Sequence, residues 1–396
     1  MIRSLRFSNF YSFRGEAEIS FEVGRQPAST HYDFPLADGS RGNKVVAVVG
    51  PNGSGKTQLL KPLAFLSWFV ADSYLNTEPR DPIPFRPHAL SADSPSHFEL
   101  HFELEGQQYR YNLTLTRQHV LHESLHLKTS RLFSYLFVRE REGETYRVKQ
   151  KGFGFGGTQA RHVRGNASLL AAAHVHDVPL AAAMVDYFRS FSYNIQVSGR
   201  AHYDHARLLN SALFFQEHPS LHQRASELLC ELDLGLSGIE LEEVEISGGG
   251  EPEGRGPFYM PMGVHRSGEG SFRLPFLDES SGTQSAYVLM QRILPVLEHG
   301  GIAVIDELDN DLHPHMLEAF LDLFRFEHTN PHQAQLIFSC HTPEVLNLLA
   351  KHQVYLVEKE ELESDAWRLD EVVGLRADDN LYAKYQSGAL GAVPEI

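Results

Sequence analysis

Eight consecutive residues could bind the phosphate chain of a nucleotide. Residues 50–57 read GPNGSGKT and match the pattern GxxxxGK[ST] at every fixed position. In such a loop the glycines let backbone amides surround a β-phosphate, the lysine reaches the β- and γ-phosphates, and the final hydroxyl binds Mg²⁺. The sequence therefore predicts ATP and Mg²⁺ as cofactors. The expected nucleotide ligands are Asn52, Gly53, Ser54, Gly55, Lys56, Thr57 and Gln58, with Lys56 also acting in catalysis and Thr57 also binding the metal.

Two adjacent carboxylates could complete this chemistry. Asp306 and Glu307 directly follow the apolar run GIAVI at residues 301–305. At the end of a buried strand, Asp306 could hold Mg²⁺, and Glu307 could orient and deprotonate the attacking water. An acidic pair after a strand is common by itself, but together with the phosphate-binding loop it predicts an ATPase that forms ADP and phosphate.

Two weaker motifs could complete the site across two copies of the chain. Ser281 and Gly282 lie in ESSGTQ, just before an apolar helical pattern, and could bind the γ-phosphate of a neighbouring subunit; the alternative is an ordinary helix N-cap. His341 follows the apolar run QLIFSC and could hydrogen-bond a γ-phosphate, although a lone loop histidine is more often structural. Asp309, just after the acidic pair, is expected to reach the nucleotide site of the partner.

The elements that must position these residues can be predicted from periodicity. KVVAVV at 44–49 reads as a strand buried on both faces, and the segment from Gln58 has helical spacing, so a strand, a glycine loop and a helix follow in order. Residues 97–150 alternate with period two and predict an antiparallel meander, whereas residues 165–235 read as helices. The last third alternates helices and buried strands, which predicts an α/β sheet.

These patterns predict three parts of one α/β fold. They are an N-terminal ATPase lobe at 1–160 with the phosphate-binding loop and the meander, a mainly helical insertion at 161–255, and a C-terminal ATPase lobe at 256–396 with the remaining motifs. Two glycine-rich stretches, 248–256 and 262–270, are expected to be loops.

Composition limits the class of protein. The chain has 396 residues, of which 42% are hydrophobic, and no apolar run approaches the length of a membrane span. Two cysteines and the lack of an apolar leader at the start predict a cytoplasmic protein without disulfides. The net charge of −16 disfavours extensive nucleic-acid contact, and Arg161, Arg164 and Arg200 are the candidates for a local path.

The motifs resemble those of ABC-type ATPase heads, the group that includes SMC, RecF and OLD-nuclease heads. The opening FSNFYSF, the combination of SSGTQ with VIDELDNDLHP, the segment LIFSCHTPEVL and the ending KYQSGALGAVPEI are similar to ATPases of bacterial abortive-infection and anti-phage systems of the Septu and PARIS type. The resemblance implies a P-loop NTPase fold with an antiparallel β subdomain and a helical insertion. It also implies a homodimer around two ATP molecules, often a higher homo-oligomer, and a co-encoded nuclease or toxin as effector.

Two departures refine this expectation. Thr283 replaces the second glycine of the usual LSGGQ signature, a variant that is usual in the narrower group. No long heptad pattern lies between Val70 and Phe272, so an SMC-like coiled-coil arm is not expected. We therefore expect a regulatory ATPase of an anti-phage system, and the alternative is a RecF- or SMC-like repair ATPase that clamps DNA.

Overall fold

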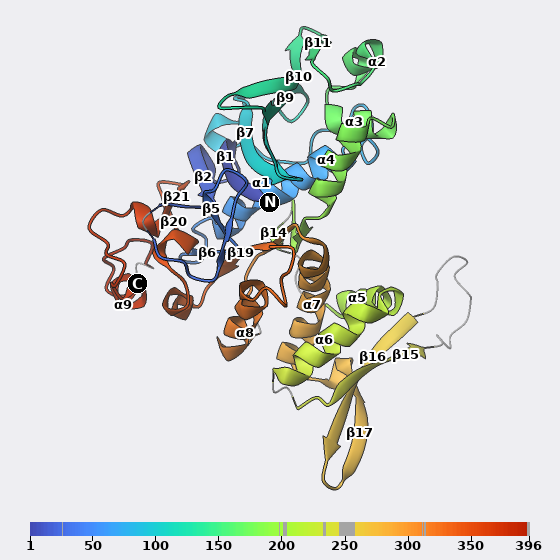
Figure 1. Ribbon diagram of the computed structural model, residues 1–396, viewed down its shortest axis with the longest axis vertical. Coiled ribbons are helices and arrows are strands. Elements are labelled where there is room, and N and C mark those ends of the chain that lie inside the picture. The colour runs from blue at the N-terminus through green and yellow to red at the C-terminus, as the bar shows by residue number, and fades with distance from the viewer. Residues whose placement is uncertain are drawn as a thin grey trace.

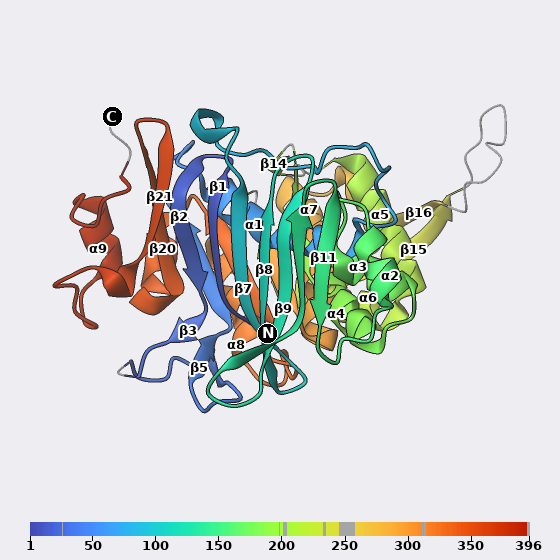
Figure 2. The ribbon, with the colours of Figure 1, turned by 90° about the horizontal axis from the view of Figure 1, so that it is seen from above.

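Two β-sheets enclose a central helix, α1 (Lys56–Asp72), in this computed structural model (Figures 1 and 2). The fold is of the α/β class, as the sequence predicts. The structure describes residues 1–25, 27–197, 199–200, 204–232, 235–244, 258–310, 312 and 314–393.

The larger sheet is antiparallel and forms one face of the molecule (Figure 2). Its meander pairs strands that are neighbours in sequence, and the N-terminal hairpin extends it at one edge. Across the sheet the strands are β11 (Thr145–Gln150), β10 (Phe133–Glu142), β9 (Val120–Lys128), β8 (Gln107–Leu115), β7 (Ser96–Leu104), β1 (Ile2–Phe10) and β2 (Phe13–Ser20).

The second sheet is parallel except at one edge, where β21 runs antiparallel to β20. Along β6, Val46 and Val48 belong to the core on the α1 side, while Val45, Ala47 and Val49 belong to the core on the opposite face. The continuous apolar run therefore reflects burial on both faces. Across the sheet the strands are β12 (Ser192–Tyr193), β18 (Ile302–Ile305), β19 (Gln335–Cys340), β6 (Val45–Val49), β20 (Val354–Glu360) and β21 (Glu363–Arg368).

Helices cover both faces of the parallel sheet. Together with α1, α3 (Leu169–Val175) and α4 (Pro179–Arg189) fill the space toward the antiparallel sheet, and α2 (Gly157–His162) follows the meander. No single helix among the described residues is long and apolar enough to cross a bilayer; α3 and α4 pass that test only as a pair, by length and composition, with a bend of 115° between them. The other helices are α5 (His205–Glu217), α6 (Pro219–Glu231), α7 (Ser281–His299), α8 (Pro314–Arg325) and α9 (Leu381–Gln386).

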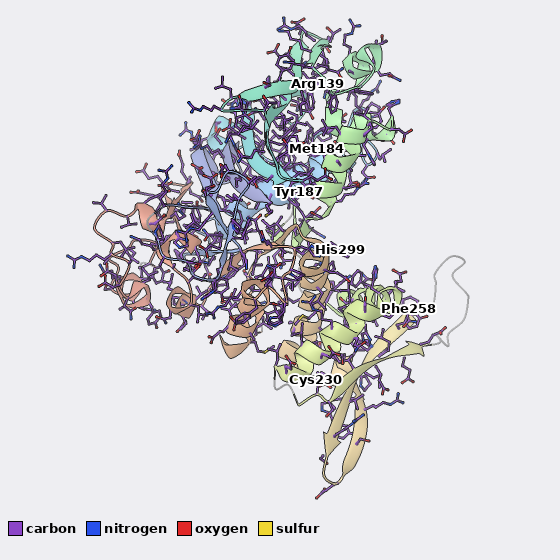
Figure 3. All side chains as sticks on the ribbon, viewed as in Figure 1. Arg139, Met184, Tyr187, Cys230, Phe258 and His299 are labelled. Atoms are coloured by element: carbon purple, nitrogen blue, oxygen red, sulfur yellow. The ribbon has the colours of Figure 1, made fainter. Side chains whose placement is uncertain are left out.

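A buried ion pair joins the meander to the helices that follow it. Arg139 lies on β10 of the meander (Figure 3). Its side chain and that of Glu123 are both fully buried and lie 3.3 Å apart, and Arg139 also donates to the carbonyls of Val163, Arg164 and Ala167. The Glu123 carboxylate accepts the backbone amide of Leu169 at the start of α3. Because removing one partner would leave a buried charge, this pair specifies how the two segments dock.

One sequence prediction is wrong in the small three-stranded sheet of β15, β16 and β17. Residues 262–270, expected to be a loop, lie in the hairpin of β16 (Phe258–Ser267) and β17 (Gly270–Pro275), which β15 (Gly238–Val244) extends. Gly263 lies within β16. A Cβ at this position would lie 2.3 Å from the Glu279 carboxylate, so the glycine marks a close approach between the strand and its neighbour. The other predicted loop, 248–256, lies outside the described residues.

Short elements complete the chain. They are β3 (Glu22–Val23), β4 (Asp33–Pro35) and β5 (Arg41–Asn43) in one sheet, the hairpin β13 (Ile195–Gln196) and β14 (Gly199–Arg200), and the 3₁₀ helices Ala89–Ser91, Phe276–Asp278, Pro343–Asn347, Lys351–Gln353 and Leu369–Glu371. In the described part of the insertion between Val70 and Phe272, the longest helices have 13 residues. No described helix there is long enough to form a coiled-coil arm.

Candidate active site

The phosphate-binding loop connects β6 to the first turn of α1, with Lys56 and Thr57 at the helix N-terminus. Lys56 Nζ donates to the carbonyls of Gly50 (2.7 Å) and Pro51 (3.1 Å) and thus lies across the loop. Burial lowers the pKa of Lys56, while the nearby carboxylates of Asp306 and Glu307 act in the opposite direction. The helix N-terminus and this ammonium place two sources of positive potential at one point.

Two glycines of the loop, Gly50 and Gly55, lie against close neighbours. A Cβ on Gly50 would lie 2.2 Å from the Val357 carbonyl oxygen, and one on Gly55 would lie 2.4 Å from Ser364 Oγ. Gly55 also has φ = 117°, which L-residues with side chains rarely adopt. Strands β20 and β21 therefore pack against the loop and leave room for backbone only.

The loop has features that fit a bound triphosphate. Ser54 Oγ and Gln58 Oε1 are buried and have no hydrogen-bond partner in the described part of the chain. A cavity of about 1240 Å³ opens beside Gly50, Pro51 and Asn52, with His341 on its wall. Of the predicted loop ligands, Asn52 lines this space, which is large enough for a nucleotide.

Asp306 lies beside Thr57, as a shared metal site requires. Thr57 Oγ1 donates to Asp306 Oδ2 at 2.7 Å, and Ser339 Oγ donates to Asp306 Oδ1 at 2.5 Å. The parallel order β18-β19-β6 explains this proximity, because the carboxyl ends of parallel strands meet at one edge of the sheet. A hydroxyl and a carboxylate at this distance suit a hard divalent cation such as Mg²⁺.

Glu307 is held on several sides. Its φ is 52°, a left-handed value that is strained for a residue with a side chain, and its amide donates to Ser339 Oγ at 2.7 Å. Its carboxylate forms an ion pair with Arg200 Nη1 and lies 3.1 Å from His341 Nε2. Burial alone would raise the pKa of Glu307, but the His341 hydrogen bond and the Arg200 charge outweigh it and keep the pKa below its ordinary value.

Asp309 fixes the loop that carries His341. Asp309 Oδ2 accepts the backbone amides of His341 (3.0 Å) and Thr342 (2.8 Å) and the Thr342 hydroxyl (2.6 Å). Within one chain, Asp309 therefore acts on the position of His341, and contact with a partner's nucleotide stays a prediction. Asp311 and His313, from the same stretch, lie outside the described residues.

The predicted signature segment begins α7. Ser280 is the N-cap, and its Oγ accepts the Thr283 amide at 3.1 Å, so the capping alternative holds for Ser280. Ser281 is exposed and Gly282 is half-buried at the first turn of the helix. Among the described residues, no hydrogen bond joins Ser281 or Gly282 to the phosphate-binding loop of the same chain. An exposed helix N-terminus is available to a ligand from outside the subunit.

Sequence reasoning missed Asn194 and Ser339 in this site and gave Arg200 a different role. Asn194, after β12, exchanges two hydrogen bonds with the backbone of Asp306, and Ser339 links Asp306 to Glu307. Arg200, interpreted as a candidate nucleic-acid contact, is instead paired with Glu307. Only Ser339 had a visible signal, as a polar residue interrupting the apolar strand before His341.

The second candidate nucleic-acid contact is also structural. Arg164 Nη2 donates to the carbonyls of Ser73 and Tyr74 and to Thr77 Oγ1, so its charge anchors the segment after α1. Arg161 is exposed and donates to Gly157 of its own helix. Arg164 and Arg200 thus have partners within the fold, and a nucleic-acid contact at Arg161, Arg164 and Arg200 stays a prediction.

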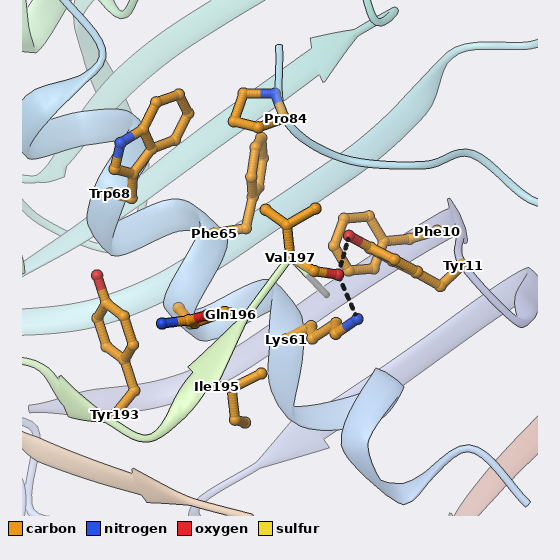
Figure 4. Close-up of a pocket in the computed structure, with 11 residues that line it drawn as sticks. Phe10, Tyr11, Lys61, Phe65, Trp68, Pro84, Tyr193, Ile195, Gln196 and Val197 are labelled. Carbon is orange, nitrogen blue, oxygen red and sulfur yellow. Dashed lines mark hydrogen bonds between the residues drawn. The ribbon is translucent and has the colours of Figure 1, made fainter. Parts of the chain in front are cut away.

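An apolar cavity of about 250 Å³ lies beside the second turn of α1 (Figure 4). Its walls include Phe65 and Trp68 of α1 and Tyr11 from the β1–β2 turn. Lys61 Nζ lies 3.9 Å from the centre of the Tyr11 ring and donates to the Val197 carbonyl at 3.0 Å. Burial lowers the pKa of this ammonium from its ordinary 10.5 to about 8.

Lys61→Met is expected to stabilise the protein most at low pH. Between about pH 8 and 10.5 the unfolded chain binds a proton at Lys61 that the folded chain does not, so wild-type stability rises with pH there. Below pH 8 the burial penalty is fully present. Urea unfolding of both proteins across this range should show a difference that is largest below pH 8 and shrinks above it.

The control for this test is Lys149→Met, which removes an exposed lysine of β11. It should change the unfolding midpoint little and without a trend over the same pH range. A constant difference between wild type and Lys61→Met would contradict the assigned burial of the charge.

Comparison with known proteins identifies the family. The family model described as "AAA domain, putative AbiEii toxin, Type IV TA system" matches residues 45–347. No curated protein matches the chain in sequence.

Similar solved structures include three Smc head domains. The head from Thermotoga maritima is 15% identical, with 93% of this chain and 98% of that chain covered and a TM-score of 0.44. An Smc head bound to the C-winged helix domain of ScpA is 12% identical, with 93% and 99% covered and a TM-score of 0.49. An Smc head with an extended coiled coil, bound to a ScpA domain derived from Pyrococcus furiosus, is 12% identical, with 93% and 97% covered and a TM-score of 0.47.

The family match spans more than half of the chain and includes both the phosphate-binding loop and the Asp306–Glu307 pair. The chain therefore belongs to the AAA-domain family described as "putative AbiEii toxin, Type IV TA system".

Proposed function

We propose that this protein binds Mg·ATP at residues 50–58 and hydrolyses it to ADP and phosphate. The observation that carries the proposal is the convergence of Thr57, Asp306 and Glu307 at the N-terminus of α1. A hydroxyl, a carboxylate and a second carboxylate beside a phosphate-binding loop are the groups that phosphoryl transfer to water requires.

The chain's own residues supply most of the mechanism. The loop amides and Lys56 bind the phosphates, and Thr57 and Asp306 would hold Mg²⁺, which neutralises phosphate charge when bound. Glu307 orients a water and accepts its proton as the water oxygen attacks the γ-phosphorus and the bond to ADP breaks. To do this, Glu307 must exchange at least part of its contacts with Arg200 and His341.

The active unit is proposed to be a homodimer with two shared ATP sites. Support comes from Ser281 and Gly282, which are accessible at the start of α7 and have no hydrogen bond to the loop of their own subunit among the described residues. In a dimer they would face the γ-phosphate held by the partner. A higher homo-oligomer is compatible with this arrangement.

Mixing two variants tests the shared site. Lys56→Ala lacks nucleotide binding in its own loop, and Ser281→Ala is expected to disable only the contact made to the partner's nucleotide. Each variant alone should be nearly inactive, whereas the mixture should recover turnover, at most one working site per dimer. If the mixture stays as inactive as its components while a mixed dimer is shown by native mass spectrometry, the trans role of Ser281 is wrong.

We further propose that the ATPase regulates a co-encoded nuclease or toxin in an anti-phage system. The support is the resemblance of the motifs to abortive-infection ATPases and the family description, which names an AbiEii toxin of a type IV toxin–antitoxin system. The net charge of −16 and the structural use of Arg164 and Arg200 favour a protein partner over DNA.

A DNA titration tests this choice of partner. Duplex binding that requires ATP and falls steeply with salt would favour the clamping function instead. Weak binding with no dependence on ATP, together with purification of the neighbouring gene product in a complex, is the expected result.

A further inference from the structure

A small cavity of about 70 Å³ lies beside Glu307, and no residue of the phosphate-binding loop lines it. Its wall includes Arg200 of β14, Arg207 of α5 and Arg292 of α7, together with Asn194 and Glu307, and apolar side chains form much of the rest. Segments far apart in the sequence thus bring three arginines and one glutamate to the wall of a single small space.

The positive charge at this cavity is only partly compensated. Arg200 is paired with Glu307, whereas the ion pair of Arg207 within the described ranges is a long one, with Nε 4.0 Å from an oxygen of the largely exposed Asp204. For Arg292, the described part of the chain provides no ion pair. The Nε atoms of Arg200 and Arg207 are buried and have no hydrogen-bond partner among the residues that the structure describes. Buried donors without acceptors are costly, and an anion would supply the missing acceptors.

The pKa of Arg292 is affected by the charge of a neighbouring arginine. Burial lowers its pKa, and the neighbouring charge of Arg207 lowers it further. Arg292 also lines a separate cavity of about 500 Å³, whose wall includes Arg189, Tyr193 and His299. Arg292 therefore lines both the small cavity at Glu307 and this larger cavity.

We propose that Arg200, Arg207 and Arg292 form a binding site for inorganic phosphate, filled by the phosphate released at Glu307. The inference rests on the proposed hydrolysis for its source of ligand. Guanidinium groups match the oxygens of a tetrahedral dianion in charge and geometry. A volume of about 70 Å³ has room for a few water-sized groups, which is the scale of inorganic phosphate.

The position of the site gives it a function in product release. The γ-phosphate that leaves Glu307 would otherwise have to exit past ADP in the phosphate-binding loop. The space that Glu307 shares with three arginines offers a separate place for the product, and Arg292 lines both this space and the larger cavity.

Direct binding of inorganic phosphate tests the site without requiring turnover. Isothermal titration calorimetry is carried out on wild type, Lys56→Ala, Arg207→Met, Arg292→Met and Arg292→Lys. Wild type and Lys56→Ala should bind one phosphate per subunit with similar affinity. Arg207→Met and Arg292→Met should each weaken binding about tenfold or more, since each removes a charge-assisted partner, and Arg292→Lys should restore part of the loss.

A matched control separates the site from the overall charge of the protein. Arg273→Met removes an exposed arginine of β17 that is paired with Glu240 and Glu242, so it changes the net charge equally and should leave phosphate binding unchanged. Melting curves followed by circular dichroism confirm that each variant is folded.

The outcomes distinguish this inference from the proposed function. Phosphate binding that Lys56→Ala abolishes and the arginine variants retain would assign the anion to the phosphate-binding loop and overturn the inference. Absence of saturable binding to folded wild type would also overturn it. If phosphate binds as expected but ATP is not hydrolysed, the site stands and the proposed reaction fails.

Discussion

Glu307→Gln is expected to reduce ATP turnover by about 10²–10⁴-fold, the usual contribution of a general base, while ATP binding is retained. The amide has nearly the same shape and can still hydrogen-bond His341, but it cannot accept a proton from water. Steady-state phosphate release and the affinity for a fluorescent ATP analogue measure the two effects separately. Because bound ATP is no longer consumed, the variant should also accumulate as the closed dimer in gel filtration.

The control for this variant is Glu140→Gln. It makes the same chemical change on β10, in an exposed ion pair with Arg147 of β11. An exposed ion pair contributes little to stability, so turnover should stay at the wild-type level. Full activity of purified Glu307→Gln would show that another group activates the water.

Lys56→Ala is expected to lower ATP affinity by about 100-fold or more. The ammonium can form charge-assisted bonds with two phosphates, and each such bond contributes about 1.5–3 kcal/mol. In the structure Lys56 Nζ already lies in the loop, within 3.1 Å of two backbone carbonyls, so it needs little movement to reach a phosphate. Titration with the same fluorescent analogue in the presence of Mg²⁺ measures the loss.

Lys61→Met provides the matched control, since it removes a lysine from the next turn of the same helix. Lys61 is bound to Val197 and Tyr11 on the wall of the apolar cavity and is not part of the phosphate-binding loop. ATP affinity should therefore be close to wild type. Equal losses in Lys56→Ala and Lys61→Met would mean that a damaged α1, and not a missing phosphate ligand, explains the result.

Local patterns were sufficient to predict most of the fold. The run KVVAVV predicted a doubly buried strand, and β6 does alternate between the two cores. The meander and the α1 helix were predicted for the same reason, because hydrophobic periodicity reports which faces of an element are buried. The prediction failed at residues 262–270, where glycine was interpreted as a loop signal although at Gly263 it marks close packing in a strand.

The sequence alone determined which groups could bind phosphate and metal, because the loop 50–57 is contiguous and Asp306 and Glu307 are adjacent. Tertiary structure alone decided what surrounds them. Arg200 meets Glu307 across 107 residues, Asn194 meets Asp306 across 112, and Arg207 and Arg292 line one cavity from different helices. Such partners have no fixed spacing, because sheet order and helix packing, not chain proximity, bring them together.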